Sequence, residues 1–180
     1  MVPCLPVYRD LWVAYLAAAA IATHILEASL PGLGPWFKPG LANIFTLVAF
    51  FAFGWRAAVA VTMIRITAAS MVLGTLFTPT IVLSLSGAAG ALLALGMVRR
   101  LLPTAGPVGC SLLAALAHIT AQLVAVIGLL TGLEGLEALM TILPWFLTAS
   151  WLTGLFNGVV AQLILERMDG SVDPIRHPKP

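Results

Sequence analysis

Residues 24–65 read HILEASLPGLGPWFKPGLANIFTLVAFFAFGWRAAVAVTMIR, and this stretch decides the fold. Apolar residues dominate it on both sides of a connection rich in proline and glycine, residues 31–40. Its most conspicuous polar interruptions are His24, Glu27, Asn43 and Arg65. An ionisable side chain at the centre of a bilayer costs roughly 2.5–3.5 kcal/mol, so such groups face the interior of a helical bundle and have partners there. The stretch therefore predicts apolar helices that enclose a polar centre.

The whole chain has the composition of an integral membrane protein. Of its 180 residues, 61% are hydrophobic and 9% are charged, and the mean hydropathy is +1.05. Soluble domains are about 45–50% apolar and about 25% charged. Because one crossing takes about 20 apolar residues, the length allows one domain of five or six spans. The net charge of +2 comes from few side chains, so it indicates orientation in a lipid bilayer and no nucleic-acid partner.

Breaks at proline, glycine and charged residues divide the chain into six expected helices. They are residues 11–30, 40–53, 57–77, 80–98, 108–130 and 139–165. The second is apolar for only about 14 residues, roughly 21 Å of helix, against a hydrocarbon layer of about 30 Å. The sequence therefore predicts an all-α, polytopic membrane protein with a bundle of six transmembrane helices, the second of them short or broken.

Loop charges predict the orientation of this bundle. With six spans, the lead 1–10 and the polar tail 166–180 lie on one side of the transmembrane domain 11–165. If that side is cytoplasmic, the basic residues that fall inside are Arg9, Arg56, Arg99, Arg100, Arg167, Arg176 and Lys179. Those that fall outside are Lys38 and the acidic Glu134 and Glu137. The positive-inside rule therefore predicts that both termini are cytoplasmic.

The ionisable pair Glu27 and Arg65 leaves two interpretations open. In one, the two side chains form a structural ion pair that fixes the packing of the first and third helices. In the other, Arg65 holds the carboxylate or phosphate of a ligand, because its planar guanidinium stays charged when buried. His24 lies three residues before Glu27 on the same helix face, and Asn43 lies in the first turn of the short helix. Short or interrupted spans are the best pointer to a binding site in transporters.

The fifth helix adds a second pair of polar residues. His118 and Gln122 are four residues apart, so they share one helix face, where they either bond to a neighbouring helix or line the same cavity. A metal site formed by His24, Glu27 and His118 is a weaker hypothesis, because these residues are scattered over two helices. We therefore predict no metal and no cofactor.

Absent motifs limit the chemistry that this chain could perform. The sequence has no phosphate-binding loop, no dinucleotide fingerprint and no nucleophile elbow. It also lacks aspartate-rich motifs that could hold magnesium on a diphosphate. Neither ATP hydrolysis nor stand-alone prenyl transfer is expected, and a membrane enzyme is only the third hypothesis.

Small residues repeat along the first helix. Ala14, Ala18 and Ala22 are four residues apart and form a face on which another helix can pack closely. Internal packing and the docking of a separate partner subunit are both open interpretations of this face.

Several short segments, taken in order, resemble a known membrane family. They are Glu27, Leu30 and Pro31, then residues 38–44 (KPGLANI), 64–66 (IRI), 83–88 (LSLSGA), 108–111 (VGCS) and 117–122 (AHITAQ). The chain resembles, over about residues 10–165, the family called Gx transporter, which is also labelled heptaprenyl diphosphate synthase component I. It departs from the family pattern where Lys38 precedes Pro39 and Gly40.

The family is in turn similar to the substrate-binding S components of energy-coupling factor transporters, which are six-helix proteins. This resemblance implies a multi-pass protein of the bacterial inner membrane that captures a small molecule and moves it through the bilayer. A transmembrane coupling subunit with ATPases would dock on Ala14, Ala18 and Ala22. The ligand itself is not specified, and the residues expected to bind it are His24, Glu27, Asn43, Arg65, His118 and Gln122.

The second label implies a different class of function. It implies a non-catalytic membrane subunit that supports a polyprenyl synthase catalytic subunit in making quinone side chains. A vitamin-like ligand would favour transport, and a polyprenyl diphosphate or quinone would favour this alternative.

Overall fold

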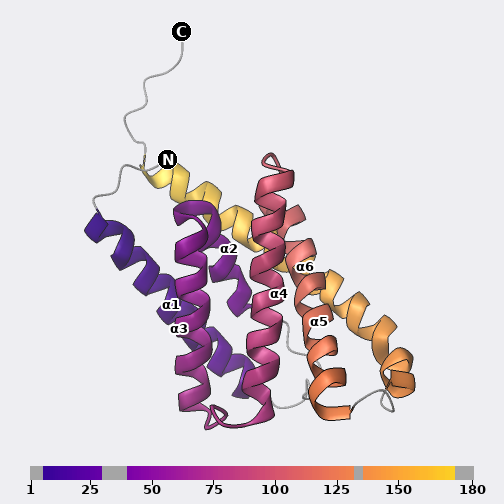
Figure 1. The fold of residues 1–180 in the computed structure, drawn as a ribbon. Coiled ribbons are helices and arrows are strands. Elements are labelled where there is room, and N and C mark those ends of the chain that lie inside the picture. The colour runs from indigo at the N-terminus through magenta and orange to yellow at the C-terminus, as the bar shows by residue number, and fades with distance from the viewer. Residues whose placement is uncertain (1–5, 30–39, 132–135, 173–180) are drawn as a thin grey trace.

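Helices make up the regular structure of the part of the chain that is described, residues 6–29, 40–131 and 136–172. In this computed structural model they are α1 (Pro6–Ser29), α2 (Ala42–Phe53), α3 (Trp55–Val72), α4 (Pro79–Leu101), α5 (Pro107–Val126) and α6 (Leu136–Val172), with a π-helical turn at Ile127–Thr131. Figure 1 shows that α3, α4 and α5 run side by side in alternating directions. The predicted all-α bundle of six helices is confirmed.

All of these helices except α2 are long enough to span a membrane. Five candidate spans are long and apolar enough to cross a membrane, and they lie in α1, α3, α4, α5 and α6. Helix α2 has 12 residues, which is about 18 Å at 1.5 Å per residue. The prediction of a short second helix is therefore confirmed.

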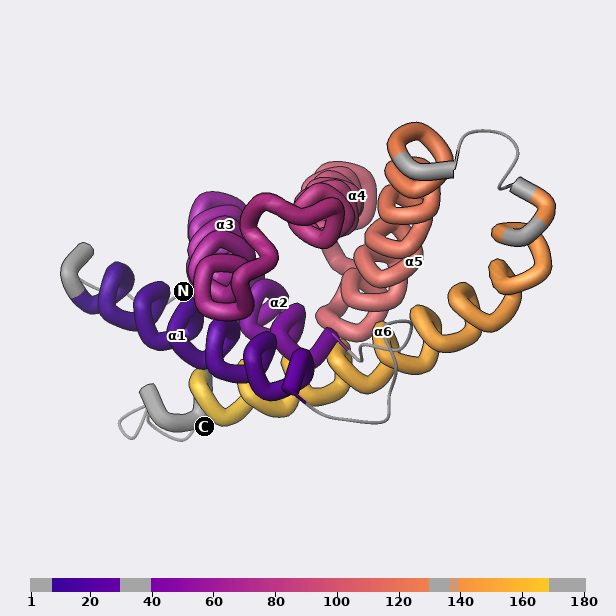
Figure 2. The backbone as a smooth tube through the Cα atoms, turned by 90° about the horizontal axis from the view of Figure 1, so that it is seen from below, coloured from indigo at the N-terminus to yellow at the C-terminus, as the bar shows by residue number. Residues whose placement is uncertain are grey.

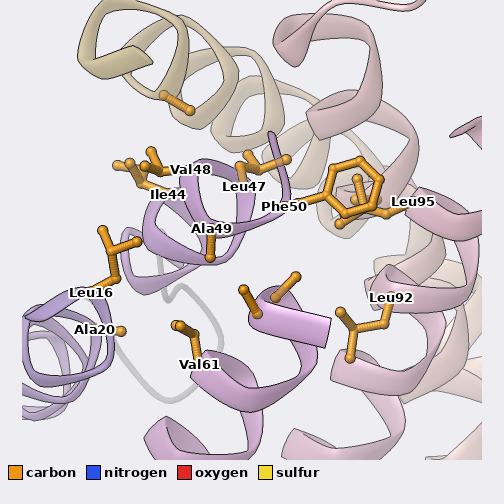
Figure 3. Packing of buried hydrophobic residues seen from close by; sticks show 14 of the residues in the cluster. Leu16, Ala20, Ile44, Leu47, Val48, Ala49, Phe50, Val61, Leu92 and Leu95 are labelled. Atoms are coloured by element: carbon orange, nitrogen blue, oxygen red, sulfur yellow. The ribbon is translucent and has the colours of Figure 1, made fainter. Parts of the chain in front are cut away.

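Helix α2 lies at the centre of the bundle. It packs against α1, α3 and α6, and Figure 2 shows it among these three helices. Its buried residues are Ala42, Ile44, Thr46, Leu47, Val48, Ala49 and Phe50. Figure 3 shows Leu16 and Ala20 of α1, Val61 of α3 and Leu92 of α4 gathered around them. Because protein surrounds α2, its length need not match the thickness of the bilayer.

Glycines set the closest approaches between the later helices. A Cβ added to Gly90 of α4 would lie 2.5 Å from the backbone oxygen of Ala117 in α5. A Cβ added to Gly158 of α6 would lie 2.7 Å from Val108 Cα, also in α5. Without a hydrophobic drive between helices in lipid, such small residues allow the backbones to pack closely. Helices α4, α5 and α6 are therefore held together through their glycines.

Helix α3 ends five residues before the predicted limit of Phe77. Gly74 has φ 69°, a left-handed conformation that few residues other than glycine adopt. The Thr75 N–H donates to the carbonyl of Ser70 (2.9 Å), and the Gly74 N–H donates to that of Met71 (3.3 Å). These two bonds form a Schellman motif, which ends a helix. The third span is shorter than expected because this glycine stops it.

Helices α1 and α6 run further than the sequence predicted. Helix α1 begins at Pro6, so part of the expected lead 1–10 is helical. Helix α6 continues to Val172, into the expected tail 166–180. Its 37 residues are about 55 Å long, well over the ~30 Å of the hydrocarbon layer, and α6 slants across the bundle in Figure 1.

Arginines gather at one end of the bundle. Figure 1 shows that the start of α1, the start of α3, the end of α4 and the end of α6 lie at the same end. The exposed arginines at these helix ends are Arg9, Arg56, Arg99, Arg100 and Arg167. Glu137 lies in the first turn of α6, at the opposite end. The charge asymmetry predicted for the loops is thus present in the fold.

Candidate functional site

A polar centre surrounds the N-terminal end of α2. Because α2 begins inside the bundle, the backbone groups at its start need partners other than water. Glu27 Oε1, from α1, accepts a hydrogen bond from the Leu41 N–H (2.7 Å). Asn157 Nδ2, from α6, donates to the carbonyl oxygen of Gly40 (3.1 Å). Gly40 has φ 63°, which favours glycine at this position. Two other helices therefore hold the start of α2.

Arg65 joins α3 to the same centre. Its Nη1 donates to Asn43 Oδ1 (2.9 Å), and Asn43 lies in the first turn of α2. Only 5% of the surface of Arg65 is exposed. Its Nε is buried and has no hydrogen-bond partner in the part of the chain that the structure describes. The buried guanidinium of Arg65 therefore bonds to the neutral amide of Asn43, and its Nε–H donor is not used by any described residue.

Glu27 and Arg65 do not form a direct ion pair. Among the described residues, the ion pair within 4.0 Å is the exposed Arg9–Asp10 contact (3.4 Å). The Glu27 carboxylate lies near enough to attract the Arg65 guanidinium through space. Each of the two side chains instead bonds to the start of α2, at Leu41 and Asn43.

His118 of α5 lies against a glycine of α4. A Cβ added to Gly87 would lie 2.5 Å from His118 Nε2 and 2.6 Å from its Cε1, so only glycine leaves room for the ring. His118 Nδ1 is buried without a hydrogen-bond partner among the residues described. Arg65 and His118 thus each carry one buried polar atom without a hydrogen-bond partner among the described residues.

Gln122 and His24 are placed differently from these two. Gln122 Nε2 donates to the carbonyl oxygen of Leu83 (3.2 Å), so it links α5 to α4. His24 is half-buried on α1, one turn before Glu27. No group of three His, Cys, Asp or Glu side chains within the described ranges could hold a metal ion. His24, Glu27 and His118 are therefore not gathered into a metal site.

The alanine face of α1 points outward. Ala14, Ala18 and Ala22 are exposed, whereas Leu16, Ala17 and Ala20 face the core. The interpretation that the first three alanines pack inside the bundle is wrong, because neighbouring positions of the same helix fill that role. Docking of a partner on this face stays a prediction.

Two surface grooves lie outside the polar centre. One, of about 480 Å³, lies between the start of α4 and the end of α5. The other, of about 520 Å³, runs along the last part of α6, between Val160 and Met168. Neither groove is lined by Glu27, Asn43 or Arg65.

Sequence reasoning left Asn157 out of the candidate site. Its position carries a signal, because it stands between Gly154 and Gly158, whose spacing is typical of a helix face that approaches another closely. A polar residue on such a face points into the protein. That it reaches Gly40, at the start of α2, depends on the tertiary fold and could not be predicted.

Comparison with known proteins identifies the family. The profile of the family described as heptaprenyl diphosphate synthase component I matches residues 16–164, which is most of the chain. No curated protein matches the sequence, and no solved structure matches it either. The family description names a component of heptaprenyl diphosphate synthase, and the fold is a membrane-like helical bundle. The chain belongs to the heptaprenyl diphosphate synthase component I family.

Proposed function

We propose that this protein binds a small anionic molecule at the polar centre around Arg65 and moves it through the membrane. The observation that carries the proposal is Arg65 itself, a guanidinium 5% exposed inside an apolar bundle. Its Nε has no acceptor among the described residues, and the bonded partner at Nη1 is the neutral side chain of Asn43.

A buried cation of this kind is costly without a counter-charge. Removing a charge from water costs several kcal/mol, which is recovered only where hydrogen bonds and an opposite charge surround it. Glu27 supplies attraction at a distance, but its Oε1 bonds to the Leu41 N–H. A carboxylate or phosphate at Arg65 Nε would supply both an acceptor and a negative charge at short range. Arginine suits this role because its planar fork of donors matches both groups.

Transport is supported by the way the site is built. The polar centre lies at the start of a short helix inside the bundle, the arrangement that marks the binding sites of many transporters. The outward alanine face of α1, with Ala14, Ala18 and Ala22, is available to a transmembrane coupling subunit that works with ATPases. The resemblance to S components of energy-coupling factor transporters points the same way.

A second candidate function follows from the family description. A component of heptaprenyl diphosphate synthase could be a non-catalytic membrane subunit that presents or accepts a polyprenyl diphosphate for a catalytic subunit. The same Arg65 would then bind the diphosphate. The chemistry of the bound molecule therefore separates the two functions.

The experiment is to identify what copurifies with the protein. Wild type, Arg65→Gln and Arg56→Gln are purified in mild detergent, and released molecules are identified by mass spectrometry. Arg56 is the matched control because it is exposed in the first turn of the same helix.

We expect an anionic molecule to copurify with wild type and with Arg56→Gln, and to be depleted at least about tenfold from Arg65→Gln, as for the loss of one charge-assisted contact. A water-soluble anion supports transport, and a polyprenyl diphosphate supports the synthase subunit. Equal recovery from all three proteins contradicts the proposal and leaves Arg65 a structural role only.

A further inference from the structure

A second polar contact joins α2 to α3 beside the bond between Asn43 and Arg65. The hydroxyl oxygens of Thr46 and Thr62, here called the threonine pair, are hydrogen-bonded at 3.0 Å. Thr46 follows Asn43 by three residues on α2, so the two share one face of that helix. Thr62 precedes Arg65 by three residues on α3, with the same consequence. The two contacts are therefore neighbours in one interface, about 4.5 Å apart along the helices at 1.5 Å per residue.

The threonine pair forms the inner end of this polar interface. Thr46 is 6% exposed and Thr62 is 1% exposed. The next turn of each helix is apolar and buried, with Phe50 four residues after Thr46 and Ala58 four residues before Thr62. Asn43, at the start of α2, is half-buried. The polar interface thus begins at the start of α2 and ends at the threonine pair.

The threonine pair carries one hydroxyl hydrogen more than its own bond uses. Two hydroxyls have two hydrogens, and the bond between them takes one. A helical threonine can donate to the carbonyl four residues earlier, as Thr23 and Thr120 do here. Within the described residues, neither member of the pair makes that bond, and their mutual contact is their hydrogen bond. One buried O–H therefore lacks an acceptor, which is unfavourable unless a bound molecule supplies one.

The neighbouring contact also offers donors. Arg65 Nε–H is buried and no described residue accepts from it. Side chains on a helix lean toward its N-terminus, so the Arg65 side chain is directed back toward the turn that holds Thr62. Asn43 accepts from Arg65 through Oδ1, which leaves its amide N–H groups as donors. The interface therefore suits a group that only accepts hydrogen bonds, as an ionised carboxylate does.

We propose that the threonine pair is a second contact of the anion site, and that it donates its spare O–H hydrogen to the anion bound at Arg65. This rests on the proposed function, since it adds two residues to the same site. One oxygen of the anion accepts from Arg65 Nε–H, and another accepts from the threonine pair. The site therefore selects an anion with at least two oxygens, a carboxylate or a phosphate, over a single-atom anion such as chloride.

The test removes both hydroxyls together. Methyl phosphate is titrated into the protein in phosphatidylcholine nanodiscs. The double variant Thr46→Val/Thr62→Val nearly keeps the shape of both side chains, and replacing both partners of a buried hydrogen bond by apolar groups can be nearly neutral for stability. The double variant Thr46→Ser/Thr62→Ser keeps both hydroxyls. Thr23→Val is the control outside the interface, because it removes a buried hydroxyl hydrogen bond within α1.

We expect the valine double variant to bind methyl phosphate at least about tenfold more weakly than wild type, because a hydrogen bond to a charged group is lost. The serine double variant and Thr23→Val are expected to bind as wild type does. Wild-type affinity in the valine double variant overturns the inference, and so does an equal loss in the serine double variant. Methyl phosphate binding that is absent from wild type, or retained in Arg65→Gln, overturns the proposed function instead.

A measurement on wild type covers the case in which the valine double variant does not fold. The γ-methyl NMR signals of Thr46 and Thr62 are assigned with the single serine variants. Methyl phosphate is expected to shift both signals and to leave that of Thr23 in place, whereas sodium chloride at the same concentration leaves all three in place. Signals of the threonine pair that stay in place at saturating methyl phosphate, or that move equally with sodium chloride, overturn the inference.

Discussion

At the scale of single residues, the polar side chains of the centre stabilise a buried helix start. The Glu27 carboxylate is the acceptor that the structure gives to the Leu41 N–H, at 2.7 Å. A carboxylate near a helix N-terminus is also stabilised by the helix dipole. The Gly40 carbonyl accepts from two donors, Asn157 Nδ2 (3.1 Å) and the Asn43 N–H (2.9 Å). Glu27 is therefore harder to replace than Asn157.

This difference predicts an order of stabilities. Glu27→Ala leaves the half-buried Leu41 N–H without this acceptor and lowers the free energy of unfolding by about 1–3 kcal/mol. Glu27→Gln keeps an acceptor oxygen and loses less. Thermal unfolding in detergent measures both, with Glu137→Gln as the exposed control, for which a change within about 0.5 kcal/mol is expected. Glu27→Ala as stable as wild type would contradict the assignment of Glu27 to the start of α2.

Asn157→Leu is predicted to cost less than Glu27→Ala. The substitution removes one of the two donors to Gly40 O, and the carbonyl keeps the hydrogen bond from the Asn43 N–H, so the loss of this bond costs about 1 kcal/mol. The same unfolding measurement compares the two variants directly. A larger loss for Asn157→Leu would mean that α6 depends on this residue for more than the bond to Gly40.

At the scale of elements, the packing of α4 on α5 depends on glycine. A Cβ at Gly90 would lie 2.5 Å from a backbone oxygen and 2.7 Å from Ala121 Cβ, and neither atom is the end of a flexible side chain. Helix α4 would have to move away from α5 to admit it. His118 lies against Gly87 one turn away, so this movement would also disturb the contact between these two residues.

Gly90→Ala is therefore predicted to lower stability, and Gly109→Ala is not. Overpacking of this kind costs typically about 1–3 kcal/mol. Gly109 is helical in α5 and has nothing within 4 Å of an added Cβ. Both substitutions replace glycine by alanine, which has the higher helix propensity, but only Gly90→Ala also introduces a clash. Melting temperatures of the two variants give the comparison. Equal melting temperatures would contradict the close approach of α4 and α5.

At the scale of the whole molecule, the bundle places its charges at one end. Figure 1 shows both ends of the described chain near the arginine-rich end, and Glu137 starts α6 at the other. The positive-inside rule predicts that the arginine-rich end is cytoplasmic. The polar centre, at the start of α2, would then lie toward the outer leaflet.

Cysteine labelling tests this orientation. Thr104 lies in the connection between α4 and α5, and Glu137 lies at the opposite end, and both are exposed. In a background with Cys4→Ser, where Cys110 is buried, a membrane-impermeant thiol reagent added to intact cells is expected to label Glu137→Cys and not Thr104→Cys. Labelling of Thr104→Cys alone would reverse the topology.

Much of the fold could be predicted because membrane helices are encoded locally. Proline, glycine and charge mark the helix ends, and the apolar run of α2 is visibly too short. The early end of α3 was also encoded, by Gly74, but one glycine carries little weight within an apolar run. Helix α6 is longer than the sequence predicts, because Arg167 and its polar neighbours continue the helix although charged residues commonly mark a helix end.

The candidate site was predictable as a set of residues and not as a set of contacts. Glu27 and Arg65 were conspicuous because ionisable groups are rare in lipid. Each of these side chains could bond to the other, to α2 or to a ligand. The choice depends on how each helix is rotated and how deep it lies in the membrane, which the sequence does not specify. The outward direction of Ala14, Ala18 and Ala22 depends on rotation in the same way.

The central claim is that Arg65 Nε binds the anionic group of a ligand. It is tested most directly by NMR of the arginine Nε–H groups in nanodiscs, with Arg65→Gln used to assign the Arg65 signal. Addition of methyl phosphate is predicted to shift the Arg65 Nε–H signal and to leave that of the exposed Arg56 in place. An Arg65 signal that does not move at saturating methyl phosphate would contradict the claim.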